Sequence, residues 1–116
     1  MKYFLPHEFK MGDEIVFDKM DSGLLDMLED ARESAGIPFQ ITSSYRNAEY
    51  NSKIGGSHNS AHLRGKAVDI SCVNSSARGK ILNALFKVGF RRIGIARNFI
   101  HVDNDDSLPQ NVCWLY

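Results

Sequence analysis

The chain has 116 residues, of which 43% are hydrophobic and 24% are charged, as in ordinary globular domains. Fourteen basic residues balance fourteen acidic ones, so no overall positive field indicates nucleic acid or an anionic membrane as a partner. No apolar run approaches the roughly 20 residues that span a bilayer. The opening MKYFLPHEFK also lacks the apolar core of a signal peptide. We therefore expect one monomeric domain over residues 1–116, without a membrane span.

The first predicted elements are a turn in KMGDE and a helix after it. Four apolar side chains recur at helical spacing in DSGLLDMLEDARES: Leu24, Leu25, Leu28 and Ala31. This spacing predicts an amphipathic helix over residues 22–35. Asp21 or Ser22 would cap its start, and Gly36 and Pro38 would stop it.

Short elements follow in the middle of the chain. PFQITSSY alternates apolar and polar residues and predicts a strand, and RNAEYNSKIGG predicts a short helix ended by its glycine pair. SHNSAHLRG is predicted to be a polar loop. The next run, KAVDIS, predicts a strand that presents Asp69 on the face opposite Val68 and Ile70.

The last third of the chain predicts a helix, two strands and a tail. NSSARGKILNALFKVG is the helix, capped by Asn74 or Ser75, with one buried stripe: Ile81, Leu82 and Leu85. FRRIGIAR and NFIHVD are two strands around a tight turn, and NVCWLY is apolar enough to dock on the core. Helices alternating with an antiparallel-leaning sheet predict an α+β fold. Cys72 and Cys113 are too few for a disulfide framework, and we expect two reduced, half-buried thiols.

Two stretches carry residues suited to a metal site. In SAHLRGKAVD, a turn at Gly65 can bring His62 toward Asp69, and in NFIHVD, His101 and Asp103 share one strand face. Two histidines and one carboxylate would give zinc three protein ligands and leave a fourth position for water. The same residues also fit an ordinary turn and strand with idle histidines. Spacing alone leaves both interpretations open.

The wider pattern resembles a known family. SAHLRGKAVD matches Ser-x-His-x-x-Gly-x-Ala-x-Asp of the M15 zinc peptidases, which include D-alanyl-D-alanine carboxypeptidases and phage endolysins. ITSSYRNAEYNSKIGG, IGIARNFIHVD, KYFLPHEF and the late Trp114 are also similar, so the resemblance covers nearly the whole chain. It implies a small α+β domain like those of the DD-peptidases and Hedgehog proteins, and a zinc-dependent hydrolase that cleaves peptides of bacterial peptidoglycan.

The resemblance also implies roles for individual residues. His62, Asp69 and His101 would bind one zinc ion per chain. Arg46 would hold a carboxylate or carbonyl of the peptide, since a guanidinium can clamp a carboxylate through two hydrogen bonds. Tyr45 would lie beside Arg46 at the substrate. Ser60 is assigned to the same region, where it caps or braces the loop.

The sequence departs from the family at the general base. Many relatives carry Glu-x-x-His or His-x-His before the last ligand, whereas NFI precedes His101 here. Asp103 is the nearest acid and would either deprotonate the water or orient His101. In a second arrangement, Asp103 is the ligand and His101 the base. A zinc-bound but catalytically silent binding module is the alternative function, as in Hedgehog signalling domains. Without a signal peptide, we expect delivery by a virion, release by a holin or another export route.

Overall fold

A five-stranded sheet forms the centre of the structure, a computed structural model that describes residues 1–116. Neighbouring strands are antiparallel except the last pair, which is parallel. The strands in spatial order are β3 (Ile41–Ser43), β4 (Ala67–Ser71), β6 (Phe99–Asp103), β5 (Arg92–Ile95) and β7 (Val112–Leu115). A separate hairpin joins β1 (Lys10–Met11) to β2 (Glu14–Ile15). The sheet with its helices confirms the predicted α+β fold.

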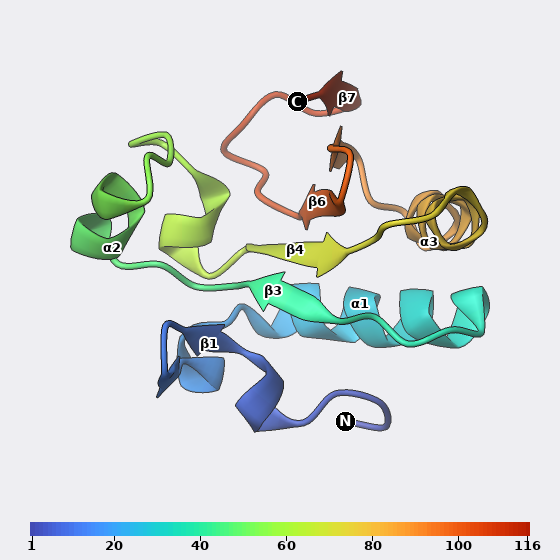
Figure 1. Cartoon of the computed structure of the whole chain (residues 1–116), viewed down its shortest axis with the longest axis horizontal. Coiled ribbons are helices and arrows are strands. Elements are labelled where there is room, and N and C mark those ends of the chain that lie inside the picture. The colour runs from blue at the N-terminus through green and yellow to red at the C-terminus, as the bar shows by residue number, and fades with distance from the viewer.

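Three α-helices begin at side-chain caps that satisfy backbone N–H groups. They are α1 (Ser22–Ala35), α2 (Ala48–Lys53) and α3 (Ser75–Lys87). Asp21 caps α1 by accepting from the Leu24 N–H at 2.9 Å, and Asn74 caps α3. The caps are therefore Asp21 and Asn74, the first of the two candidates that the sequence offered for each helix. Helix α1 spans the predicted residues 22–35, and Gly36 ends it with a φ of 70°. Figure 1 shows α2 at one end of the molecule and α3 at the other.

The hydrophobic core covers only one face of the sheet. Alternation places Val68, Ile70, Ile100 and Val102 on that face, where each is fully buried with the apolar side chains of α1 and α3. The opposite face is left to the intervening residues, which include Asp69 and His101. In α3 the buried stripe differs by one residue from the prediction. Ala84 is buried there, while Leu82 is only partly buried.

Several segments differ from the sequence-based expectations. The predicted polar loop contains a 3-10 turn, Ala61–Arg64, and two further 3-10 turns lie at Pro6–Glu8 and Phe17–Lys19. The tail does not dock on the core but forms β7 at the sheet edge, where parallel pairing with β5 leaves Leu115 exposed. Of the two thiols, Cys72 is buried and Cys113 exposed, so neither is half-buried, although both are unpaired as expected.

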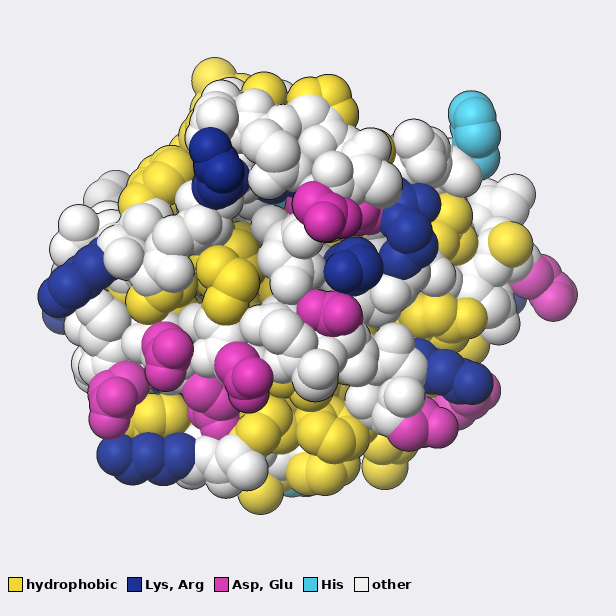
Figure 2. Space-filling model, turned by 180° about the vertical axis from the view of Figure 1, so that it is seen from behind, with side chains coloured by type: hydrophobic (Ala, Val, Ile, Leu, Met, Phe, Trp, Pro, Cys, Tyr) yellow, Lys and Arg dark blue, Asp and Glu magenta, His cyan; other side chains and the backbone are white.

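The surface carries charges of both signs. On the face shown in Figure 2, acidic and basic side chains lie among one another, in keeping with a formal net charge of zero. None of the helices combines the length and the apolar character that a membrane crossing demands. Figure 1 shows the N-terminal segment and β7 at opposite sides of the molecule.

Candidate metal centre

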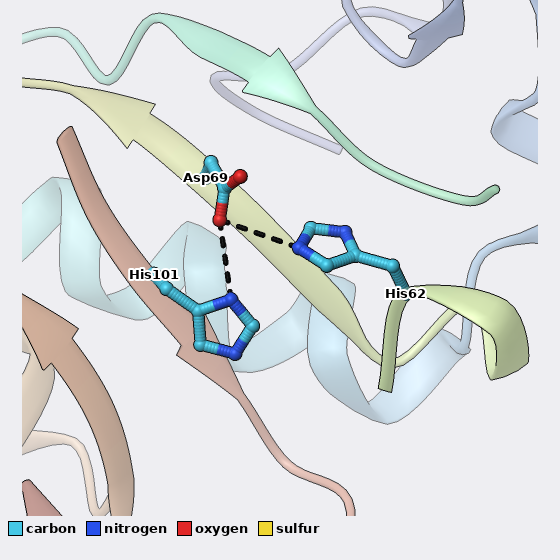
Figure 3. A group of neighbouring side chains, drawn as sticks. All are labelled: His62, Asp69 and His101. Carbon is cyan, nitrogen blue, oxygen red and sulfur yellow. Dashed lines mark hydrogen bonds and ion pairs between the residues drawn. The ribbon is translucent and has the colours of Figure 1, made fainter. Parts of the chain in front are cut away.

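Three potential metal ligands converge from three elements. His62 lies on the Ala61–Arg64 turn, Asp69 on β4 and His101 on β6, and their ligand atoms all lie within 4.8 Å of one another. Asp69 and His101 are direct partners in the antiparallel register of β4 and β6. Figure 3 shows both imidazole rings turned toward the same carboxylate oxygen of Asp69. The structure therefore assembles the two sequence stretches into one candidate site.

Gly65 places the first histidine. Its φ of 68° lies in the left-handed region, which favours glycine. A Cβ at this position would also lie 2.0 Å from the carbonyl oxygen of Lys19, so no side chain fits. The turn that Gly65 closes is braced at its start by Ser60, whose Oγ accepts from the His62 N–H at 3.2 Å. His62 is consequently 2% exposed although its segment is polar.

The hydrogen bonds of His62 fix its tautomer. Nδ1 lies 2.8 Å from the carbonyl oxygen of Ser44, and a carbonyl only accepts, so Nδ1 carries the proton and donates. Nε2 of the neutral ring then presents a lone pair. This atom lies 3.3 Å from Asp69 Oδ1.

His101 repeats this pattern with its nitrogens exchanged. Nε2 donates to Asp103 Oδ2 at 2.6 Å, and Nδ1 lies 3.1 Å from Asp69 Oδ1. If both rings are neutral and His101 carries its proton on Nε2, two lone pairs face one carboxylate oxygen, an arrangement that is repulsive unless a cation or additional protons lie between them. Ligand atoms on one tetrahedral zinc are about 3.3 Å apart, close to the distances of both ring nitrogens from Asp69 Oδ1, and all three ligand atoms lie within 4.8 Å of one another. The donor set thus fits a divalent metal ion.

The close contacts within the cluster also shift the pKa values of Asp69 and His101. Burial by itself would raise the pKa of Asp69, but hydrogen bonds from His101 and His62 outweigh it and hold that pKa far below its usual range. Burial would lower the pKa of His101, whereas its hydrogen bonds to Asp103 and Asp69 raise it above the ordinary value. Positive charge is accordingly stabilised at the centre of the cluster, whether as protons or as a metal ion.

Both carboxylate oxygens of Asp103 accept hydrogen bonds from neighbouring residues. It is 1% exposed, and besides accepting from His101 it accepts at Oδ1 from Arg92 Nε at 2.7 Å and from the Asp105 N–H at 3.2 Å. Asp103 is absent from the group whose ligand atoms lie within 4.8 Å of one another. Its contacts suit a carboxylate that orients a metal-binding histidine better than one that deprotonates water.

Arg46 borders the cluster on the side of β3. Its Nη2 lies 3.5 Å from Asp69 Oδ2, the carboxylate oxygen that the histidines leave open. Asn51 and Ser43 accept from the other guanidinium nitrogens at 3.2 and 3.1 Å. A Cβ added at Gly56 would lie 2.1 Å from Asn51 Oδ1, so a larger residue here would displace the Asn51 side chain that accepts from Arg46. Tyr45 is partly buried against the hydrophobic core.

A cavity of about 330 Å³ lies beside the cluster on the side of β7. Its lining combines site residues with the polar loop and the tail: Ser57, Asn59, Ser60, Ala61, Arg92, His101, Asp103, Leu108, Trp114 and Tyr116. A separate cavity of about 400 Å³ beside β3 includes His7 but none of the three clustered residues. His58 is exposed and lines neither.

Gly94 lets the tail reach this cavity. One row across the sheet runs from Asp69 through His101 and Gly94 to Trp114. A Cβ on Gly94 would lie 2.4 Å from Trp114 Nε1, so only glycine leaves room for the indole, whose ring centre is 5.4 Å from that of His101. Sequence reasoning missed Arg92, Gly94 and Tyr116. The alternation in FRRIGIAR could have placed Arg92 and Gly94 on one face of a strand. It could not have shown that this strand pairs with β6, which sets Gly94 opposite His101.

The family model of Peptidase M15 matches residues 2–103. The chain therefore belongs to the Peptidase M15 family. The match contains Arg46, His62, Asp69, His101 and Asp103 and ends before β7 begins. No curated protein matches the chain closely enough to count as a relative. Membership of Peptidase M15 implies a metallopeptidase, a hydrolase of peptide bonds, and the His62, Asp69 and His101 cluster is its candidate metal site.

Proposed function

We propose that the protein is a zinc-dependent peptidase that hydrolyses a peptide bond of bacterial peptidoglycan, either as a carboxypeptidase or as an endopeptidase. One zinc ion per chain would be held by His62, Asp69 and His101. The observation that carries the proposal is the pair of imidazole nitrogens facing Asp69 Oδ1 at 3.3 and 3.1 Å, in a chain of the M15 family. These nitrogen and oxygen donors are ligands that zinc prefers.

Zinc in this position would polarise the scissile carbonyl and lower the pKa of a bound water to about 7. Arg46 binds a carboxylate or carbonyl of the peptide through its guanidinium. It is available for this role because its contact with Asp69 is long, at 3.5 Å, and would weaken further if a metal ion neutralised that carboxylate. Ser60 and Tyr45 complete the proposed substrate-binding residues. Ser60 lines the cavity, and Tyr45 directly precedes Arg46 in the sequence. Asp103 orients His101 and is not itself a ligand, which its three hydrogen bonds favour.

The peptidoglycan assay tests this function. The purified protein, loaded with zinc, is incubated with peptidoglycan, and the release of D-alanine and of new amino groups is measured with and without a chelator. We expect release that stops on chelation and returns with zinc. Free D-alanine would identify a carboxypeptidase, and new amino groups without it an endopeptidase. Activity that survives chelation would refute the zinc mechanism.

A catalytically silent binding module is the second candidate. It is favoured by one observation: no carboxylate or imidazole lining the cavity is free to act as a base, since His101 and Asp103 bind one another. The same assay separates the two functions. One zinc bound per chain, without turnover at any pH, would favour the binding module. Action on the cell wall also requires a route there, for which we propose virion delivery, holin release or export.

A further inference from the structure

Tyr116 is a titratable side chain of the cavity that the proposed mechanism does not use. The other titratable groups of the lining are Arg92, His101 and Asp103. Those three form one chain of hydrogen bonds, His101 to Asp103 and Asp103 to Arg92. Tyr116 takes no part in these hydrogen bonds, and the family match ends thirteen residues before it, at Asp103.

The fold holds the Tyr116 ring over the site face of the sheet. Its backbone N–H donates to the Ile95 carbonyl at 3.0 Å, which continues the pairing of β7 with β5. Its ring centre lies 5.0 Å from that of Phe99 and 6.4 Å from that of Trp114. Gly94 makes room for it as well, because a Cβ there would lie 2.8 Å from Tyr116 Cε2. Packing on two aromatic rings thus positions a residue that is otherwise 67% exposed at the cavity rim.

The phenol stays protonated near neutral pH and is therefore a hydrogen-bond donor. Partial burial of the ring raises the pKa of Tyr116, and the negative charges of Asp69 and Asp103 raise it too. Trp114 and Arg46 offset only part of this shift.

Arg46 and Tyr116 flank the cluster from opposite sides. Arg46 follows β3 at one edge of the sheet, and Tyr116 follows β7 at the other edge, with the row from Asp69 to His101 between them. A peptide that Arg46 holds across the cluster would consequently pass the Tyr116 hydroxyl. A neutral donor in this place suits the carbonyl oxygen, which becomes negative as the peptide bond is attacked.

We propose that Tyr116 is a catalytic residue whose hydroxyl donates a hydrogen bond to the carbonyl oxygen of the scissile peptide as charge develops on it. The inference rests on the proposed peptidase function. The proton remains on the phenol throughout, so Tyr116 neither replaces the missing base nor needs one. Because the interaction strengthens only as the oxygen becomes charged, it lowers the barrier more than it tightens substrate binding.

The test compares Tyr116→Phe with Tyr3→Phe in the zinc-loaded protein. Tyr116→Phe keeps the ring that packs on Phe99 and Trp114 and removes only the hydroxyl. Tyr3→Phe removes a hydroxyl that lies beside Glu33 of α1, outside the cavity. For Tyr116→Phe we expect kcat to fall about tenfold to a hundredfold, KM to change less than about threefold, and zinc content to stay the same. A kcat within twofold of the unaltered protein would overturn the proposal.

A second measurement separates failure of this inference from failure of the proposed function. A phosphinic alanyl-alanine pseudodipeptide carries a tetrahedral anionic group in place of the scissile carbonyl, and its affinity needs no turnover. We expect Tyr116→Phe to weaken its binding about tenfold or more and Tyr3→Phe to leave it unchanged. Equal affinity for all three proteins, or no binding by any of them, would overturn the role of Tyr116. If Tyr116→Phe weakens binding of the pseudodipeptide but the unaltered protein shows no turnover, the Tyr116 contact stands and only the proposed peptidase function is refuted.

Discussion

His101 Nε2 lies 2.6 Å from Asp103 Oδ2, and this contact determines which nitrogen of His101 faces Asp69. The two residues are therefore expected to behave differently when altered. His101→Ala should abolish zinc binding, because it removes a ligand. Asp103→Asn should keep most of the zinc at saturating metal and lower its affinity about tenfold to a hundredfold, with a slower reaction. Elemental analysis and chelator competition measure both. An empty site in Asp103→Asn, with zinc retained in His101→Ala, would contradict this assignment.

Arg92 Nε donates to the other oxygen of Asp103 at 2.7 Å, and Arg92 Nη1 donates to the Pro109 carbonyl at 2.6 Å. Arg92→Met should leave Asp103 a buried carboxylate without its counter-charge and free to turn away from His101. We expect about tenfold weaker zinc binding by chelator competition. Arg91→Met is the matched control, since Arg91 is exposed and donates only to Asn111. Equal zinc affinity in the two variants would show that Arg92 does not position Asp103.

Gly94→Ala should displace Trp114 from the cavity wall. The added methyl group would meet Trp114 Nε1 at 2.4 Å, and we expect a loss of about 1–3 kcal/mol in the free energy of unfolding. Trp114 is the one tryptophan of the chain, so its fluorescence should also shift toward longer wavelength. Gly79→Ala is the control on exposed helix surface, with nothing within 4 Å, and should stabilise by about 0.5–1 kcal/mol. Unchanged fluorescence in Gly94→Ala would contradict the packing described for β7.

Asp21 should make the stability of the fold depend on pH. The hydrogen bond from Asn104 lowers the pKa of Asp21, and the Leu24 N–H and Lys66 add to this effect against the opposing effect of burial. A carboxyl whose pKa is lower in the folded state stabilises fully above its unfolded pKa of about 4, and this stability is lost as pH falls through the folded value.

Asp21→Asn removes that charge while keeping a side chain that can cap α1. We expect the variant to be about 1 kcal/mol less stable than the unaltered protein at pH 7, with the difference shrinking toward pH 3. Urea unfolding at several pH values measures it, beside Asp26→Asn on the exposed side of the same helix. A difference that grows on acidification would mean that the sign of the Asp21 shift is wrong.

The sequence predicted the parts of the site that depend on local pattern. Strand alternation placed Asp69 opposite the core face, and the glycine turn indicated how His62 could approach it, as the structure shows. The register that sets Asp69 against His101 joins residues 32 positions apart, and no local pattern contains it. The family resemblance implied only that both residues bind one zinc ion, and the register itself is seen in the structure.

The tail was harder to predict because its place depends on the sheet it joins. An apolar run such as NVCWLY fits a core segment and an edge strand equally well. The structure favours the edge, because Gly94 leaves room for Trp114 and because the other face of the sheet is already covered by α1 and α3. Arg92 was missed for the same reason: its partner Asp103 lies on a different strand, β6.

A crystal structure of the protein with zinc bound would show directly which residues hold the ion. We expect one ion per chain, with His62 Nε2, Asp69 Oδ1 and His101 Nδ1 each within about 2.0–2.2 Å of it and Asp103 still bonded to His101 Nε2. An ion coordinated by Asp103 in place of His101, or bound outside this cluster, would contradict this expectation.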